Sequence, residues 1–270
     1  MNGASSTSEP ALLGGAPPAR SATIRQLTPP GVLGVWAAAA IPMAALAWVI
    51  APLAAGGWNS PSALAQSLIL LLTVGLVWQF VLVAFLVFKE QRSLRWAVVR
   101  EALWLRAPRN PKTGRRGGRM WLIVPVFVIA FFAVELIPFE IPPVAGRDFG
   151  EFLGSSDGAA LLHGSWPWLA ILLAFFTFNT VLGEELLFRG YLLPRMKGVF
   201  GSKDWVANGI LFAAYHLHVP WAIPVALLDT FILSLPSRRY RSALIGIITH
   251  SSQCLFLFAL VLMLFLTAPQ

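Results

Sequence analysis

Long uncharged apolar runs constrain this chain more than any other feature. Residues 32–55, 63–88 and 243–267 contain no Asp, Glu, Lys or Arg, and each exceeds the roughly 20 residues that a helix needs to cross a hydrocarbon core. Only 12% of the 270 residues are charged, against about 25% in a typical soluble domain. Because backbone in lipid must satisfy its own hydrogen bonds, the sequence predicts an all-α polytopic transmembrane bundle.

We expect about seven spans, or at most eight, in one integral membrane domain over residues 31–270. Residues 1–30 are rich in Ser, Pro, Ala and Gly and lack an apolar signal-peptide core, so we expect a disordered cytoplasmic tail there. The other predicted spans are 120–142, 166–192, 205–222 and 222–236. The last is short and flanked by Pro220, Pro224 and Pro236, which is typical of segments that border protein or a water-filled cavity.

The placement of Lys and Arg predicts the orientation in the membrane. Residues 89–119 hold ten of the twenty basic residues, so this loop is expected in the cytoplasm, whereas residues 135–165 are mainly acidic and are expected on the other side. The N-terminus is then cytoplasmic. The positive net charge has this topological explanation, so a nucleic acid partner is not expected. Within the basic loop, residues 93–106 have the spacing of an amphipathic helix, either interfacial or packed on the bundle.

Ionisable residues inside the spans are the candidates for chemistry, because each is costly in hydrocarbon. They are Glu184, Glu185, Arg189, His216, His218, Asp229 and His250. Counted from the basic ends of their spans at about 1.5 Å per residue, Glu184, His216 and His250 reach similar depths. Three helices therefore bring polar groups to one level, which favours a shared site.

Helix geometry separates the two adjacent glutamates. Glu185 and Arg189 stand at i and i+4 in the favourable order and are expected to pair as a buried scaffold. Glu184 lies about 100° around the helix and is left without that partner. A carboxylate facing histidines in a low-dielectric cavity suits a general base or acid.

One Glu and two His at a common depth allow two mechanisms, both of which hydrolyse an acyl bond. In the first, Glu184, His216 and His250 are zinc ligands with a fourth position open for water. In the second, Glu184 deprotonates a water held by His216 while His250 stabilises the oxyanion. The few ligands favour the metal-free version, with zinc kept as an alternative.

Three motifs in this region resemble a known family. GEELLFR (183–189) matches the EExxxR motif of the type II CAAX prenyl endopeptidase-like family, also called the CPBP or Abi family of intramembrane proteases. FAAYH (212–216) matches its FxxxH motif, and HSSQC (250–254) matches in part a third motif, His followed four residues later by Asn. The motifs occur in the family's order on separate spans and cover about a quarter of the chain.

The resemblance implies roles for individual residues. Glu184 corresponds to the catalytic glutamate that activates water with His216, and His250 to the histidine that stabilises the oxyanion. The supporting positions are Glu185, Arg189, Phe212 and Cys254. Cys254 replaces the asparagine of the prenyl-protease branch, and a thiol is a much poorer hydrogen-bond donor than an amide. As the only cysteine, it allows no intramolecular disulfide, and it could alternatively act as a nucleophile.

These observations favour an intramembrane endopeptidase, with its catalytic core over about 166–267, that cuts a membrane-associated protein or peptide near the cytoplasmic side. We expect it in a bacterial inner membrane. The first alternative is an inactive member of the family that acts as a membrane scaffold or partner protein. The second is a transporter or proton relay, which would be expected to show related halves with paired broken helices; no such repeat is present in the sequence.

Overall fold

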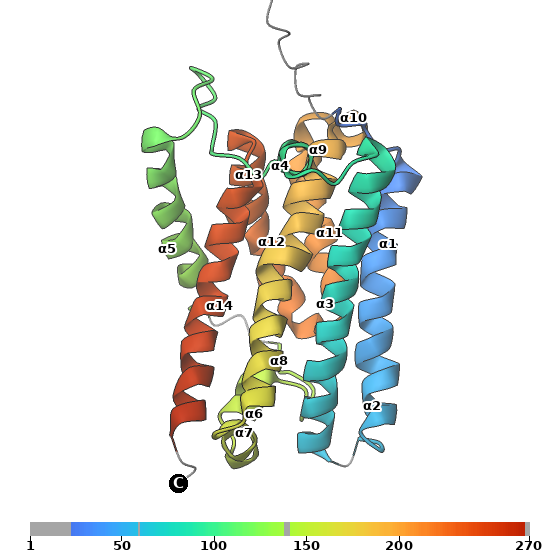
Figure 1. Cartoon of the computed structure of the whole chain (residues 1–270), viewed down its shortest axis with the longest axis vertical. Helices are drawn as coiled ribbons and strands as arrows, with labels where there is room; N and C mark the ends of the chain where they lie inside the picture. Colours follow the sequence, from blue (N-terminus) through green and yellow to red (C-terminus); the bar gives the residue numbers. More distant parts are fainter. Residues whose placement is uncertain (1–22, 59, 138–140, 268–270) are drawn as a thin grey trace, which may run out of the picture.

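The computed structural model describes residues 23–58, 60–137 and 141–267, and these residues form a bundle of helices running along one long axis (Figure 1). Within the described residues, five continuous helical segments are long and apolar enough to cross a membrane: Pro29–Ala54, Pro61–Gln91, Trp166–Arg195, Pro220–Tyr240 and Ala243–Leu266. A shorter apolar helical segment spans Gly118–Val134. The predicted polytopic helical bundle is confirmed.

The first half of the chain supplies four helical segments. The segments are α1 (Pro29–Ala45), continued by η1 (Leu46–Ile50) and α2 (Ala51–Ala54); α3 (Pro61–Gln91); α4 (Trp96–Ala102); and η2 (Gly118–Ile123) with α5 (Val124–Glu135). The predicted amphipathic helix over 93–106 is shortened to α4. The predicted third span ends at Glu135 rather than at residue 142.

The second half contains the segments that carry the predicted motifs. They are the short helices α6 (Phe149–Leu153) and α7 (Ser156–Leu162); a long irregular helix made of α8 (Trp166–Phe176), η3 (Thr177–Glu184), η4 (Leu186–Leu192) and α9 (Leu193–Arg195); α10 (Lys197–Phe200) with η5 (Gly201–Lys203); α11 (Asp204–Tyr215); the turns η6 (His216–His218) and η7 (Pro220–Ala222); α12 (Ile223–Asp229), η8 (Thr230–Ser234) and α13 (Leu235–Tyr240); and α14 (Ala243–Leu266).

Proline and a hydroxyl cap set the start of the first two long helices. The Thr28 side chain accepts a hydrogen bond from the Gly31 amide at 3.3 Å, and the Ser60 hydroxyl accepts one from the Ala63 amide at 3.4 Å. A proline follows each cap at the first helical position, where its missing N–H costs nothing and its fixed φ suits the helix. These local signals begin α1 and α3 at opposite ends of the bundle.

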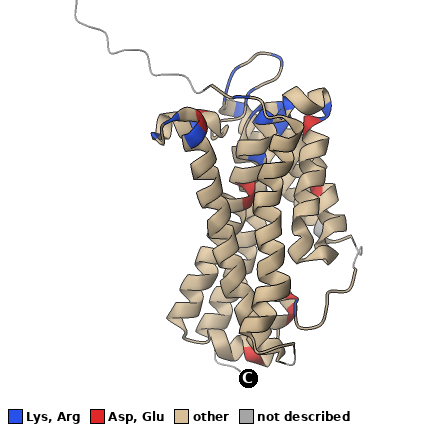
Figure 2. Ribbon diagram, turned by 90° about the vertical axis from the view of Figure 1, so that its right-hand side faces the viewer, with Lys and Arg blue, Asp and Glu red and all other residues tan. Residues whose placement is uncertain are grey.

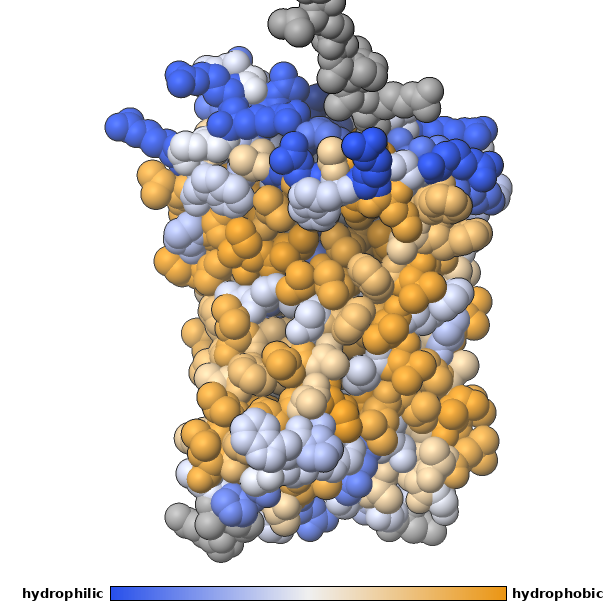
Figure 3. Space-filling model, viewed as in Figure 1, coloured by the Kyte–Doolittle hydropathy of each residue, from blue (hydrophilic) through white to orange (hydrophobic). Residues whose placement is uncertain are grey.

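Charge and hydropathy divide the molecule along its long axis. Lys and Arg gather at the end where α4, α9, α10 and α13 meet (Figure 2), and an apolar band covers the middle of the face shown in Figure 3. The separation of a basic end from an apolar band is the distribution expected of a membrane protein with one strongly basic face.

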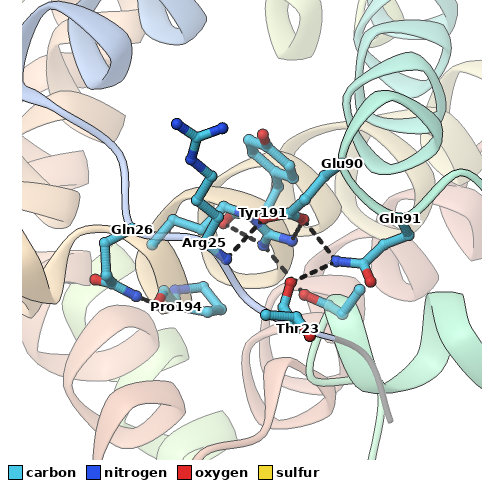
Figure 4. A network of polar contacts seen from close by, with 9 residues as sticks. Thr23, Arg25, Gln26, Glu90, Gln91, Tyr191 and Pro194 are labelled. Atoms are coloured by element: carbon cyan, nitrogen blue, oxygen red, sulfur yellow. Dashed lines mark hydrogen bonds and ion pairs between the residues drawn. The ribbon is translucent and has the colours of Figure 1, made fainter. Parts of the chain in front are cut away.

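The first described residues are attached to this basic end. The Arg25 backbone amide donates to Glu90, and the Gln26 side chain donates to the carbonyl of Pro194 at 3.0 Å (Figure 4). Glu90 also forms an ion pair with the buried Arg195. The tail expected over residues 1–30 lies mainly outside the described residues, and its last part, from Thr23 onward, is bound to the bundle.

The spans predicted over 205–222 and 222–236 form a pair that turns back inside the bundle. Helix α11 has 12 residues, so it extends about 18 Å and is too short to cross a hydrocarbon core of roughly 30 Å. The chain reverses its direction through η6 and η7, and the segment that begins with α12 then runs back toward the basic end. In Figure 1 the turn between these two orange segments lies above the level of α6 and α7. His216 therefore lies at the inner end of α11.

Candidate active site

The residues of the first motif lie on an irregular stretch of helix. Thr177–Glu184 and Leu186–Leu192 adopt π-helical geometry within the segment that starts at α8. Glu184 is 3% exposed, and Glu185 and Arg189 are completely buried. π-helical turns are rare and occur frequently at functional sites, so this stretch is a departure from ordinary helix where the candidate chemistry lies.

Glu185 lies between the side chains of Arg189 and His250. Its Oε1 is 3.0 Å from Nη1 of Arg189 and 3.1 Å from Nδ1 of His250. The predicted pairing of Glu185 with Arg189 is confirmed as an ion pair by distance, although the donor angle is not that of a hydrogen bond. The contact with His250 was not predicted, and it joins the first motif to the third.

A glycine allows the third-motif helix to approach this carboxylate. A Cβ on Gly246 would lie 2.3 Å from Oε2 of Glu185 and 3.1 Å from the Ser237 hydroxyl. Because Gly246 is one helical turn before His250 on α14, the missing side chain lets the helix place that histidine beside Glu185. The close approach therefore depends on the glycine.

Phe212 packs between Arg189 and the two histidines of the site. The guanidinium of Arg189 lies 3.9 Å from the centre of the Phe212 ring, a cation–π contact. The same ring meets His216 edge to face at 4.8 Å and His250 at 6.0 Å. Phe212 is thus a packing partner of all three residues, as expected for a supporting position.

His216 is oriented by its own helix. Its Nδ1 lies 2.9 Å from the carbonyl oxygen of Phe212, and since a carbonyl can only accept, Nδ1 is the protonated nitrogen. The neutral ring then presents a lone pair on Nε2. The His218 ring stacks on it with centroids 5.6 Å apart.

Glu184 has a tyrosine as its polar neighbour. Tyr215 is fully buried and lies beside the Glu184 carboxylate, while the Gln79 amide donates to the Tyr215 hydroxyl at 2.6 Å. Sequence reasoning missed Tyr215 and Gln79. Tyr215 directly precedes the histidine of the second motif, but Gln79 belongs to α3 and no local pattern connects it to Glu184.

One cavity collects the three candidate catalytic residues. Glu184, His216 and His250 all line a space of about 280 Å³ between α3, the irregular helix and α14. A neighbouring space of about 500 Å³ is lined by His216, His250 and Asp229. The cavity provides room for a water molecule and part of a substrate beside the three side chains.

The two residues at the end of the third motif lie in different surroundings. Cys254 is buried in an apolar cluster with Phe176 and Val261 and is not among the residues that line either space. Gln253 lines both. Gln253 stands at i+3 from His250, so helical spacing alone would have placed it on the histidine's face. The amide beside the cavity comes from Gln253.

The zinc alternative requires ligands that converge on one point. Among the described residues, no three or more His, Cys, Asp or Glu side chains form a cluster able to hold a metal ion. The chemistry proposed below therefore uses the side chains alone.

Comparison with known proteins gives one match. No curated protein and no solved structure matches the sequence. Residues 165–256, about a third of the chain, match the family model described as type II CAAX prenyl endopeptidase Rce1-like. This segment contains Glu184, His216 and His250. The resemblance drawn from the three motifs is therefore confirmed: residues 165–256 are similar to the type II CAAX prenyl endopeptidase Rce1-like family.

Proposed function

We propose that this protein is an intramembrane endopeptidase that hydrolyses a peptide bond of a membrane-associated protein or peptide. One observation carries the proposal: Glu184, His216 and His250, which all belong to the segment that matches an endopeptidase family, line a single cavity. Glu184 and His250 are buried and His216 is half-buried, and three ionisable groups that share one space among apolar helices are costly unless they serve a function.

In the proposed reaction, a water molecule is held between the Glu184 carboxylate and the lone pair on Nε2 of His216. Glu184 removes a proton as the water oxygen attacks the scissile carbonyl carbon, which forms a tetrahedral intermediate. The C–N bond then breaks, and the proton passes from Glu184 to the leaving amine. The catalytic core is proposed to lie within residues 166–267.

His250 is proposed to stabilise the oxyanion. With Nδ1 donating to Glu185, a protonated ring offers Nε2–H to the developing negative charge. The amide of Gln253, on the same cavity wall, is a second donor, while Glu185, Arg189 and Phe212 orient the histidine.

The location of the chemistry follows from the charge distribution. Glu184 stands 11 residues before Arg195, the last residue of the 30-residue segment Trp166–Arg195, so it is nearer to the basic end of its helix than to the other end. With the basic end proposed as cytoplasmic by the positive-inside rule, the scissile bond lies nearer the cytoplasmic side. We propose a bacterial inner membrane as the location, with the N-terminus in the cytoplasm.

The direct test uses the full chain purified in detergent and a panel of membrane peptides, some of them lipidated. Glu184→Gln and His216→Ala are expected to lower kcat by about 10²–10⁴-fold, the usual range for general base catalysis. His250→Ala should cost about 10²–10³-fold. The exposed Glu151, which lies outside the cavity, supplies Glu151→Gln as the matched control.

The same assay separates the alternatives. Equal background cleavage by wild type and all three variants, across the whole panel, would exclude a protease and favour the inactive scaffold. A chelator arm with zinc add-back tests the mechanism: cleavage is expected to persist in the chelator. Loss of cleavage that zinc restores would replace the metal-free mechanism.

A further inference from the structure

An apolar groove lies between α3, α4 and the irregular helix. It has a volume of about 550 Å³, and the described residues that line it are all apolar. Helix α3 contributes four of them at i, i+3, i+4 and i+7, which places them in one stripe along the helix: Phe80, Val83, Ala84 and Val87. None of the lining residues also lines the cavity that contains Glu184. The groove is therefore a second site, separate from the candidate active site.

One end of this groove has the composition of a membrane interface. Helix α4 follows the end of α3, and Leu94 and Trp96 at its start line the groove while remaining 54% and 66% exposed. Trp is enriched where hydrocarbon meets the lipid headgroups, because its ring is apolar and its N–H is polar. The end at α4 therefore suits a headgroup, and the stripe on α3 leads from it toward the hydrocarbon.

Basic side chains lie at the same end. Four exposed ones stand within two positions of a lining residue, at the basic end seen in Figure 2: Lys89, Arg92, Arg95 and Arg100. None of the four forms an ion pair with a described residue. The neighbouring acids are engaged elsewhere, since Glu90 pairs with Arg195 and Glu101 with Arg106. An apolar groove with a positive end matches an amphiphile that has an anionic head.

We propose that this groove binds one acyl chain of an anionic phospholipid, whose phosphate lies among Lys89, Arg92 and Arg95. Basic residues beside a membrane attract anionic lipids, each by about fivefold in binding. Lipid tails are as apolar as the groove, so the acyl chain fixes the position of the lipid and adds little to its affinity. The selectivity of the site therefore comes from the headgroup.

The test maps where a lipid binds and does not depend on cleavage. The full chain is placed in phosphatidylcholine nanodiscs with a trace of phosphatidylglycerol that carries a photoactivatable diazirine at the end of one acyl chain. Crosslinks, located by mass spectrometry, are expected on the α3 stripe and on Val181 or Leu182. The exposed Leu33 and Ile41 of α1 should be labelled at least about tenfold less, and so should the groove when the same probe has a choline headgroup.

Two matched triple variants test the headgroup site. One is expected to lower groove labelling by the phosphatidylglycerol probe to that of the choline probe: Lys89→Gln, Arg92→Gln and Arg95→Gln. The control removes three exposed cations of the basic loop, none of which lines the groove, and should leave the labelling unchanged: Lys112→Gln, Arg115→Gln and Arg119→Gln.

The position of the chain is tested by filling the groove. Ala84→Phe should move the crosslinks away from the α3 stripe, and crosslinks that stay there would contradict the site. If Ala84→Phe fails to fold, the triple variants still decide, because they alter exposed residues only.

Three other results would overturn the proposal. Equal labelling of the groove and of α1, or by the two headgroups, would leave only ordinary boundary lipid. Loss of labelling in the loop variant and not in the groove variant would place the attraction in the loop. Displacement of the probe by a palmitoylated peptide amide, with none by excess unlabelled phosphatidylglycerol, would assign the groove to a lipidated substrate.

Discussion

Oε1 of Glu185 lies 3.1 Å from Nδ1 of His250 and 3.0 Å from Nη1 of Arg189. One carboxylate oxygen thereby connects two helices whose residues are 65 positions apart in the chain. The contact fixes the ring of His250 and leaves its Nε2 for the cavity. Glu185 is a positioning residue, because it acts on the proposed oxyanion donor and not on the substrate.

Glu185→Gln should weaken both folding and catalysis. It removes the charge that compensates Arg189 and His250, and breaking a buried ion pair by removing one partner typically costs about 3–5 kcal/mol. Denaturation in mixed micelles should show this loss. The pH profile of kcat should also change, because His250 loses its carboxylate partner. Glu101→Gln removes a more exposed ion pair with Arg106 and should cost under about 1 kcal/mol; an equal loss in the two variants would contradict the prediction.

Gly246→Ala should damage the site without altering any polar group. The new methyl would meet Glu185 at 2.3 Å, so helix α14 must move away, at a typical cost of about 1–3 kcal/mol. We expect a fall in kcat of more than tenfold together with lower thermal stability. Gly34→Ala, in α1 with nothing within 4 Å of the added Cβ, is the matched control and should be neutral or slightly stabilising. Retention of full activity by Gly246→Ala would show that the close approach is not needed.

Gln253 and Cys254 are predicted to differ in their contribution to catalysis. Gln253→Leu removes a cavity-facing amide and should lower kcat by about 10–100-fold if that amide helps to bind the oxyanion. Cys254→Ala changes a residue in an apolar cluster and should lower kcat less than threefold. Steady-state kinetics on one substrate decide between them. The reverse order of effects would make Cys254 the cavity residue, and complete loss in Cys254→Ala would point to a thiol nucleophile.

The proposed orientation can be tested with single cysteines in a Cys254→Ala background. Lys112→Cys lies in the basic loop and Asp157→Cys in the exposed first turn of α7 at the opposite end. In intact cells, a membrane-impermeant maleimide should label position 157 and not position 112. Labelling of both after permeabilisation is the control for accessibility. The opposite pattern would invert the topology.

The sequence predicted what depends on composition and local spacing. The apolar runs predicted the bundle, and the i, i+4 spacing predicted the contact of Glu185 with Arg189. The contact of Glu185 with His250 was not predictable, because it depends on how α14 packs and on the room left at Gly246. The same holds for Gln79, which reaches Tyr215 from α3 across 136 positions.

The helix geometry around the first motif also could not be predicted from the sequence. The 100° separation of Glu184 and Glu185 assumes regular α-helix, whereas Thr177–Leu192 is largely π-helical. The spacing of apolar residues does not reveal where a helix becomes π-helical, since tertiary contacts stabilise such turns. The position of Arg147, which also lines the cavity, depends on a coil segment folding against Ala47 and Trp48, which no periodic pattern indicates.

The residues that line the cavity determine how much of the chain is needed to enclose Glu184. Ala65, Leu68 and Leu72 line it from α3, and Arg147 lines it from the coil before α6. All of these residues lie outside the segment 165–256 that matches the family. A protein trimmed to that segment would keep every motif yet expose Glu184 to lipid or detergent on one side. The matched segment contains the reactive groups, whereas the earlier part of the chain builds the compartment in which they face a substrate.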